Sequence, residues 1–517
     1  MEKLYNNVIL EDGFAAKCCD FFDTPYLKSP PEVIDVSVGR QLFVDNFLID
    51  NTDLSPEHHK AKKYEGNPVL FPEESWERER SPAACPKSGG VWYDEDEKIF
   101  KMWYEGTWLG YMCYATSEDG IHWHRPVLND GKTNIILPYE RGESDEAIPF
   151  PNDTGYLRPD STTVWIDYDA PRGERYKLFL RNPGAKYPAI IGVSEDGINF
   201  RDLRYTGVVD DRSTMFYDVF RKKWIFSIRS QKWNGRFNRC RKYYECDDFY
   251  DAADWDADKE SFWMKTDELD LPRADIGERP HLYNVDCVGY ESITLGMFQI
   301  LYGPDNNTCA KRGMPKITEL MPMYSRDGYH FTRPSRESII APSKADGAWD
   351  KGYVQSVGGV TIINGDELWI YYIAFAGDGS KTGDEETIGN GMYCNGATGL
   401  AKLRRDGFVS MNGDGKLTTR KLKFFGKEDM YVNVDGRVCA KILDENGEIL
   451  ACSEVFCGDS TKAKLNFDGF EITELNGRVF RIEFTVCGKL YSFGFADASG
   501  DFGGAHAAGE VRSNNEE

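Results

Sequence analysis

The sequence has fewer basic than acidic residues and no long apolar segment. Lys and Arg number 62 against 85 Asp and Glu, which gives the 517 residues a formal net charge of −23. Because binding of nucleic-acid phosphates needs a basic surface, no nucleic-acid partner is expected. No apolar run approaches the roughly 20 residues of a membrane span, so no membrane partner is expected. Residues 1–13 also lack the apolar run of a signal peptide.

The sequence also lacks paired cysteines and clustered histidines. Its 13 cysteines are scattered without a C-x-x-C pair, and His58 and His59 have no companion ligand set among the 7 histidines. We therefore expect reduced thiols, a cytoplasmic location, no metal and no other cofactor. The composition leaves a homo-oligomer open.

Aromatic residues are abundant, at 14% of the chain. They occur in short segments with β-branched residues, bounded by Asp, Asn and Gly, as in K-I-F-K-M-W-Y-E-G from Lys98 to Gly106. Such segments are typical of strands. Long helical periodicity is absent, so the sequence predicts an all-β protein.

One short phrase recurs five times along the chain. It reads S-E-D-G-I-H-W at Ser117–Trp123, S-E-D-G-I-N-F at Ser194–Phe200 and S-R-D-G-Y-H-F at Ser325–Phe331. Two degenerate copies lie around Asp247 and at Arg404–Phe408. A unit repeated at this spacing indicates a repeat array. Five copies predict a five-bladed β-propeller.

The pattern changes along the chain and suggests four parts. Residues 1–37 are irregular and predict an N-terminal arm, and residues 38–411 carry the propeller. Residues 412–497 read as the short strands of a β-sandwich, and the Gly-, Ser- and Asn-rich residues 498–517 predict a disordered tail. The apolar segment Arg40–Asp50 is expected to supply strands that help close the propeller ring.

The repeat locates the residues around the central channel. In four blades the first strand ends in a turn carboxylate, such as Asp167 or Asp218, and begins seven residues earlier, where it should meet the mouth of the channel. The fifth blade has no such carboxylate. This offset gives Lys87, Asp160, Asp211 and Asn284 in blades one to four. In blade five, alignment of its G-G-V with the G-G-V of blade one gives Ser356, so these five residues are predicted to form a ring at the mouth. Asp286 points to the same side as Asn284, since side chains alternate along a strand.

The predicted catalytic residues are Asp160, Asp211 and Asp286. Carboxylates that face one another split their pKa values, and glycoside cleavage uses that split: one group protonates the leaving oxygen and another attacks the sugar or activates water. The alternative is that an aspartate at a strand start caps a turn. That role is the expected one for Asp119, Asp196, Asp327, Asp406 and Glu291.

Other polar or aromatic residues near the predicted mouth could bind substrate. Arginines could clamp hydroxyls or a carboxylate, and a tryptophan could stack on a sugar; the ordinary alternatives are ion pairing and core packing. The polar loop Gly377–Gly391 is either a lid or a connection. The candidate substrate-binding residues are Glu79, Lys87, Trp108, Arg158, Arg212, Arg279, His281, Asn284 and Gln355.

Several phrases carry a resemblance to a known superfamily. They are N-P-V-L-F-P at Asn67–Pro72, R-Q-L-F-V-D-N-F-L-I from Arg40, and D-R-S-T-M-F-Y-D from Asp211. With the repeats, they resemble the five-bladed β-propeller glycoside hydrolases, in particular a poorly characterised bacterial branch similar to family 32. The fructosidase signature W-M-N-D-P-N-G is absent, and R-P-D at Arg158–Asp160 stands near the place of the family's R-D-P.

The resemblance implies a five-bladed propeller followed by a C-terminal β-sandwich, with catalytic carboxylates on the inner strands. The expected function is hydrolysis of a small oligosaccharide or glycoside by acid/base cleavage at the propeller mouth. Two alternatives stay open: a non-catalytic carbohydrate-binding propeller, and a glycoside phosphorylase that would use Arg158, Arg212 and Lys87 for phosphate.

Overall fold

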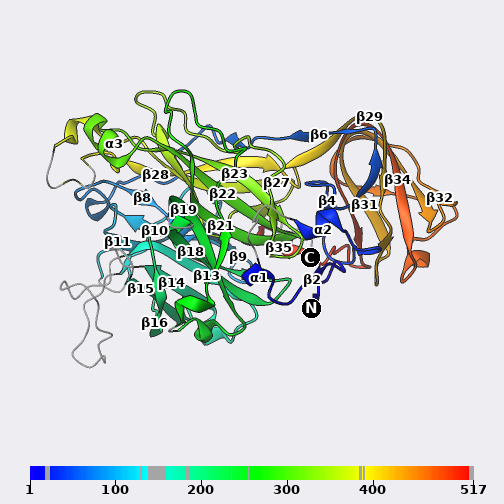
Figure 1. Ribbon diagram of the computed structural model, residues 1–517, viewed down its shortest axis with the longest axis horizontal. Coiled ribbons are helices and arrows are strands. Elements are labelled where there is room, and N and C mark those ends of the chain that lie inside the picture. The colour runs from blue at the N-terminus through cyan, green and yellow to red at the C-terminus, as the bar shows by residue number, and fades with distance from the viewer. Residues whose placement is uncertain are drawn as a thin grey trace.

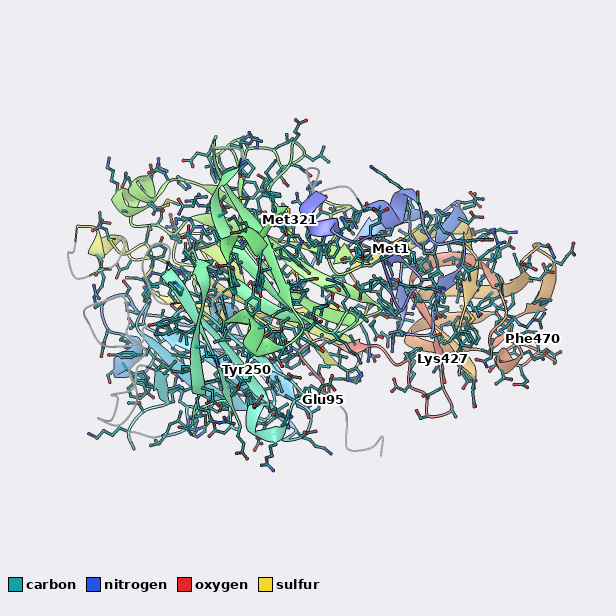
Figure 2. The ribbon with its side chains drawn as sticks, turned by 60° about the horizontal axis from the view of Figure 1, so that its bottom comes forward. Met1, Glu95, Tyr250, Met321, Lys427 and Phe470 are labelled. Atoms are coloured by element: carbon teal, nitrogen blue, oxygen red, sulfur yellow. The ribbon has the colours of Figure 1, made fainter. Side chains whose placement is uncertain are left out.

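A computed structural model describes residues 1–17, 24–128, 131–137, 159–181, 187–233, 236–253, 255–383, 387 and 390–511 (Figure 1). Strands dominate these ranges, and the α-helices are the short α1 (Phe14–Lys17), α2 (Pro25–Lys28) and α3 (Asn306–Arg312). No helix in the described ranges has the length and apolar character to cross a membrane. Two lobes lie side by side: Figure 2 labels Tyr250 and Met321 in the larger and Lys427 and Phe470 in the smaller.

The larger lobe is a five-bladed β-propeller, as the repeat predicted. Each blade is a separate, mainly antiparallel sheet. Blade 1 contains β8 (Ala84–Cys85), β9 (Val91–Asp94), β10 (Ile99–Gly106), β11 (Tyr111–Ser117) and β12 (Ile135–Leu137). Blade 2 contains β13 (Asp160–Ile166), β14 (Tyr176–Arg181), β15 (Tyr187–Ser194) and β16 (Arg201–Val209). Blade 3 contains β17 (Thr214–Asp218), β18 (Lys223–Trp233), β19 (Arg236–Cys246) and β20 (Ser261–Met264).

Blades 4 and 5 complete the ring. Blade 4 contains β21 (His281–Glu291), β22 (Ile293–Gly303), β23 (Ile317–Ser325) and β24 (Phe331–Thr332). Blade 5 contains β25 (Gly352–Ser356), β26 (Ile362–Asn364), β27 (Glu367–Phe375) and β28 (Gly396–Arg404). The inner segments contact one another in order, from the turn Lys87–Gly89 through β13, β17, β21 and β25 and back to that turn. Their first residues therefore converge at one end of the axis.

The ring is closed by a segment other than the predicted one. β7 (Lys62–Lys63) pairs with β28 as the outer strand of blade 5. The segment Arg40–Asp50 instead supplies β4 (Gln41–Leu42) and the first residues of β5 (Ile49–Thr52), which pair within the smaller lobe. The prediction was wrong because the apolar side chains of this segment, Phe43, Phe47 and Leu48, are buried in the core of that lobe.

The smaller lobe is a ten-stranded sheet around its own hydrophobic core. Its two longest strands, β31 and β34, pair along almost their whole length. The expected sandwich form and the domain boundaries stay predictions. The strands are β3 (Ile34–Asp35), β4, β5, β6 (Ser55–His58), β29 (Val409–Thr419), β30 (Leu422–Lys423), β31 (Asp429–Asp444), β32 (Ile449–Cys452), β33 (Phe456–Leu465) and β34 (Phe480–Ala496).

The predicted disordered tail is wrong as far as Val511. β35 (Ala505–His506) pairs with β21 of blade 4, and β36 (Glu510–Val511) pairs in parallel with β26 of blade 5. The small residues that suggested disorder allow a close fit: a Cβ at Gly504 would lie 2.4 Å from a carboxylate oxygen of Glu291. The same composition therefore serves packing rather than disorder.

The repeated D-G phrase builds a turn that holds neighbouring blades together. Asp119 Oδ1 accepts hydrogen bonds from the backbone N–H groups of Ile121 and His122, both at 2.8 Å. Asp196 and Asp327 make the same pair of contacts in their blades. Each turn then docks on the preceding blade around the ring, as when Trp103 Nε1 of blade 1 donates to the Gly197 carbonyl of blade 2 at 2.7 Å. The turn role predicted for these aspartates is confirmed.

We expect Gly197→Ala to lower the free energy of unfolding by roughly 1–3 kcal/mol more than Gly365→Ala does, because it overpacks a rigid core contact. Both glycines have positive φ, at 73° and 58°. A Cβ at Gly197 would lie 2.7 Å from the buried Trp103 ring, whereas a Cβ at Gly365 meets nothing within 4 Å. Denaturant unfolding measures both variants. Equal losses would show that the blade contact carries no stability beyond the backbone conformation.

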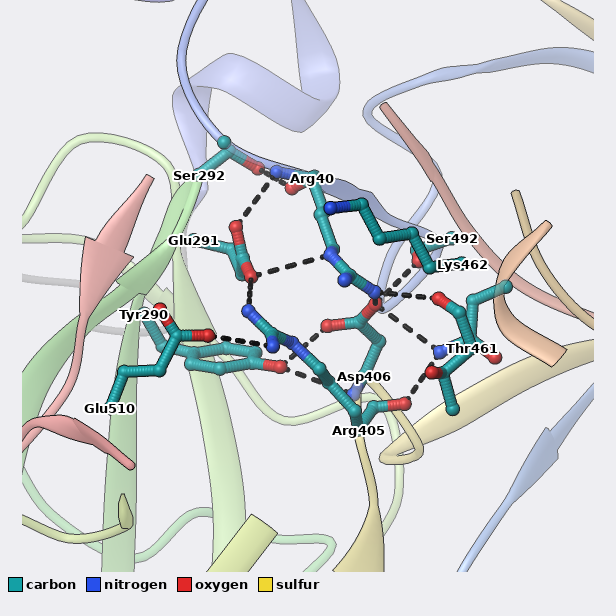
Figure 3. A network of polar contacts seen from close by, with 12 residues as sticks. Arg40, Tyr290, Glu291, Ser292, Arg405, Asp406, Thr461, Lys462, Ser492 and Glu510 are labelled. Atoms are coloured by element: carbon teal, nitrogen blue, oxygen red, sulfur yellow. Dashed lines mark hydrogen bonds and ion pairs between the residues drawn. The ribbon is translucent and has the colours of Figure 1, made fainter. Parts of the chain in front are cut away.

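The fifth D-G phrase has a different environment at the junction of the lobes (Figure 3). Asp406 is fully buried and accepts hydrogen bonds from Arg40 Nη1 at 3.2 Å, Ser492 Oγ at 2.6 Å and the Tyr290 hydroxyl. Arg40 precedes β4, Ser492 belongs to β34, and Tyr290 belongs to blade 4. The carboxylate therefore joins the propeller to the smaller lobe.

Candidate active site

A cavity of about 340 Å³ lies at the end of the propeller axis where the inner strands begin. This volume falls in the lower part of the roughly 300–1,000 Å³ range of small-molecule sites. Every blade contributes to its wall, through strand residues or the segments that follow them. The lining residues are Trp108, Leu109, Asp160, Arg181, Asp210, Asp211, Arg229, Arg239, Tyr283, Asn306, Lys316, Tyr353 and Tyr393.

Backbone irregularities turn the inner strands toward this cavity. Lys87, Ser161 and Arg212 stand at or beside the predicted mouth positions of three blades, Tyr353 stands three residues before that of the fifth, and all four have φ between 41° and 60°. The pairing register also shifts beside Asp160 and at the start of β25. Non-glycine residues rarely adopt this conformation, and bulges of this kind redirect side chains. Such strain gathers at functional sites, which supports a functional role for the mouth.

Asp160 is the buried centre of a chain of charges between blades 1 and 2. It is held by Lys87 Nζ at 3.1 Å and by an ion pair with Arg181, its pairing partner on β14. Lys87 Nζ also lies 2.7 Å from Glu105 Oε1. Burial raises the pKa of Glu105, although Lys87 opposes the shift. The predicted Asp160 thus reaches the cavity with two cations beside it.

Asp211 faces the same cavity from blade 3 and forms an ion pair with Arg229. Burial alone would raise its pKa, but the cations around it, led by Arg229 and Arg181, outweigh burial and lower the pKa to about 2. The carboxyl is therefore ionised at neutral pH. An ionised carboxylate suits the role of base or nucleophile rather than proton donor.

Asp286 does not line the cavity. It is 5% exposed and accepts hydrogen bonds from Asn284 Nδ2 at 2.8 Å and from the Ser356 hydroxyl. Asn284 Nδ2 also reaches Ser88 Oγ at 3.4 Å. The structure therefore brings together the predicted mouth residues of blades 4 and 5, and it places Asp286 in a buried polar layer around the axis.

Three further candidates share that buried position. Lys87, Arg212 and Gln355 are each at most 1% exposed, and none lines the cavity. Within the described residues, the guanidinium nitrogens of Arg212 and the side-chain amide atoms of Gln355 have no hydrogen-bond partner. These groups surround the site rather than touch its open volume.

Trp108 lines the cavity, but protein groups cover its ring. The Lys87 ammonium lies 3.7 Å from the ring centroid, and the Tyr393 ring stacks on it at 4.6 Å with an interplanar angle of 11°. Because an ammonium and a stacked ring at these distances cannot share one face, the two contacts occupy opposite faces. The tryptophan thus offers a sugar its edge, not the free face that the sequence suggested.

The remaining candidates lie apart from the cavity wall. Glu79 and Arg279 are exposed, and Glu79 accepts a hydrogen bond from the Tyr111 hydroxyl at 2.9 Å. His281 is half-buried, and burial together with Arg239 and Arg279 lowers its pKa to about 4. Arg158 lies outside the described residues. Their substrate-binding roles stay predictions.

Sequence reasoning missed the cations and tyrosines of the wall. For two of them a signal was present: Arg181 and Arg229 occupy matching last positions in the apolar phrases R-Y-K-L-F-L-R and K-W-I-F-S-I-R. The matching position in blade 1 is Glu105. A charged residue that ends an otherwise apolar central strand therefore points to the mouth. Lys316, Tyr393 and Asn306 come from inter-strand segments without such a pattern.

Part of the loop Gly377–Gly391 lies outside the described residues, so its role as lid or connection stays a prediction. Across the part of the chain that the structure describes, no three His, Cys, Asp or Glu side chains gather as metal ligands. The carboxylates of Asp160 and Asp211 at the cavity form ion pairs with Lys87 and Arg229 instead.

No family model matches the chain, and no curated protein matches it. Among solved structures, it is similar to an N-acetylgalactosamine deacetylase from F. plautii, with 13% identity over 68% of this chain and 95% of that one and a TM-score of 0.43. A β-1,2-mannobiose phosphorylase from Listeria innocua matches with 12% identity over 66% and 96% and a TM-score of 0.42. The catalytic domain of an α-L-arabinofuranosidase from Coprinopsis cinerea matches with 11% identity over 66% and 97% and a TM-score of 0.40. At such low sequence identities and TM-scores, these similarities carry no information on substrate or reaction. Membership of the family-32-like branch stays a prediction.

Proposed function

We propose that the protein cleaves the glycosidic bond of a small oligosaccharide or glycoside bound in the mouth cavity. The observation that supports this most is that Asp160 and Asp211, on neighbouring blades, both line one cavity. Two carboxylates flanking a bound sugar are the usual requirement of glycosidic bond cleavage. The aromatic side chains of the same wall suit the apolar faces of a sugar ring.

The two carboxylates are proposed to take different roles. Asp211, ionised beside Arg229, is suited to act as base or nucleophile. Proton delivery then falls to Asp160, whose ion pairs with Lys87 and Arg181 must loosen when substrate enters. Asp286 supports the site from the buried layer through Ser356 and Asn284.

A glycoside phosphorylase is the second candidate, because of the charge of the wall. The cavity is lined by four cations, Arg181, Arg229, Arg239 and Lys316, against three carboxylates. Phosphorolysis requires a pocket that accepts phosphate, and these cations could provide it. They replace the predicted phosphate ligands Lys87 and Arg212, which do not line the cavity.

The experiment is product analysis on a panel of aryl glycosides and disaccharides, with and without inorganic phosphate. Release of free sugar without phosphate is the expected result. Phosphate-dependent release of a sugar phosphate would identify the phosphorylase. Sugar binding in calorimetry without any bond cleavage across the panel would contradict both and leave a carbohydrate-binding propeller.

A further inference from the structure

Lys316 has an unusual position in the cavity wall. It stands immediately before β23 and is only 5% exposed, yet it lines the cavity. Its ammonium lies 5.5–5.8 Å from the ring centroids of Tyr283, Tyr353 and Tyr393. Lysines are almost never this buried unless a carboxylate pairs with them.

Three of the four other buried lysines, Lys87, Lys101 and Lys177, lie within 4 Å of a carboxylate, and the fourth, Lys427, donates a hydrogen bond to the Phe502 carbonyl at 2.9 Å. Lys87 has carboxylates at 2.7 and 3.1 Å, and Lys101 has one at 2.9 Å. No carboxylate in the described residues forms an ion pair with Lys316. Aromatic faces attract its ammonium, but they supply no counter-charge. The group is therefore poised for an anion that comes from outside the chain.

The charges around Lys316 point the same way. Burial, and then Arg239, lower its pKa to about 8, while Asp211 and Cys309 oppose the shift and Arg229 adds to it. The nearby Asp211 is already paired with Arg229. An anionic group placed against Lys316 would thus relieve both the burial of its charge and the repulsion from the two arginines.

The overall charge of the chain does not explain this cluster. With a formal net charge of −23, the surface as a whole repels anions. Excess positive charge in one small cavity is then a local feature, and it favours a ligand that carries negative charge where it meets Lys316.

We propose that Lys316 is a specificity-determining residue that recognises an oxyanion in the mouth cavity, with the tyrosines holding its ammonium in place. This inference rests on the proposed function and narrows its ligand to an oxyanion-bearing one. The oxyanion is either the carboxylate of an acidic sugar or inorganic phosphate. The planar carboxylate group and the tetrahedral phosphate group both present oxygen atoms that accept hydrogen bonds from an ammonium group.

The test is calorimetric binding to the full-length protein and to Lys316→Met, with a hexuronic acid, the parent neutral hexose and inorganic phosphate as three separate probes. Loss of a charged hydrogen bond is expected to weaken oxyanion binding roughly 10- to 100-fold, with neutral hexose affinity unchanged. Binding to the wild type should also weaken above about pH 8, as the ammonium loses its proton, and Lys316→Met should lack that dependence. Preference for the uronic acid or for phosphate identifies the source of the oxyanion.

Lys60→Met removes an exposed lysine and serves as the matched control, with no change expected. Lys316→Arg keeps the charge, and it should retain more oxyanion affinity than Lys316→Met; it also carries the test if the methionine variant does not fold. Unchanged oxyanion affinity in Lys316→Met, or no preference of the wild type for oxyanions over neutral hexose, would overturn the inference. Oxyanion binding through Lys316 without bond cleavage would instead refute the proposed function and leave the inference standing.

Discussion

Asp211→Asn is expected to lower kcat/KM on a cleaved glycoside roughly 10²- to 10⁴-fold, the range typical of a lost acid/base group. The reason is electrostatic. Arg229 and the neighbouring cations keep the carboxylate charged, and a neutral amide can neither attack the sugar nor take a proton from water. Asp160→Asn should have an effect of the same order, since both carboxylates face the cavity. Initial rates against substrate concentration separate the loss in kcat from any change in KM.

Asp247→Asn is the control for this experiment. Asp247 belongs to a degenerate copy of the repeat phrase, is exposed, and pairs with Lys223 at the surface. Its variant should keep full activity. Asp211→Asn leaves the buried Arg229 without its ion-pair partner, which could itself disturb the cavity. The double variant Asp211→Asn, Arg229→Gln removes that unpaired charge, so an activity loss that persists in it reports the lost carboxylate. Full activity in both Asp160→Asn and Asp211→Asn would refute the assignment.

The positions of Asp160 and Asp211 could be predicted because the blades share one fixed spacing of residues along their inner strands. A turn carboxylate ends the inner strand in four of the five blades, and strand length fixes the distance back to the mouth. The same spacing placed Lys87 beside Asp160, and in the structure Lys87 Nζ lies 3.1 Å from Asp160 Oδ1. It could not show that Asp286 is buried below the cavity. Alternation correctly placed Asp286 on the side of Asn284, which donates a hydrogen bond to it at 2.8 Å, but alternation fixes only the side on which a residue lies and not its depth below the mouth.

The rest of the wall could not be predicted because it depends on contacts distant in the chain. Lys316 is recognisable only once Tyr283, Tyr353 and Tyr393 surround it. The ring closure by Lys62–Lys63 likewise depends on which apolar segment the smaller lobe buries. Local composition gave the wrong prediction of disorder for the C-terminal residues from 498 to 511. Glycine and alanine are common in disordered segments, but they also allow close packing, as at Gly504 against Glu291.

The fifth D-G phrase leads to the largest expected effect on stability. Asp406→Asn should lower the free energy of unfolding by about 3 kcal/mol, at the lower end for breaking a buried ion pair. The substitution removes the counter-charge of Arg40, and Glu291 compensates only in part, at 3.5 Å from Arg40 and 3.0 Å from Arg405 (Figure 3). Asp119→Asn is the matched control, because that aspartate is half-exposed in a turn that asparagine can also form.

The pH dependence gives this prediction a second readout. Burial would raise the pKa of Asp406, but Arg40 and Arg405 outweigh burial and lower it. A lowered pKa means that the carboxylate stabilises the fold above the pKa of an unfolded aspartate, near 3.9, and loses that contribution as pH falls toward the folded value. The difference between wild type and Asp406→Asn should therefore be full at pH 7 and shrink in acid.

The position of Asp406 also predicts how the variant unfolds. Its partners belong to the N-terminal segment, blade 4 and β34, so the carboxylate links two lobes that have separate hydrophobic cores. Weakening that link should let the lobes melt apart, and calorimetry of Asp406→Asn should show two resolved transitions where Asp119→Asn keeps the wild-type profile. A single, unshifted transition in Asp406→Asn would mean that the apolar contact between the lobes couples them without the buried charges. Cooperative unfolding of the whole chain would then depend on packing around Arg40 rather than on its ion pairs.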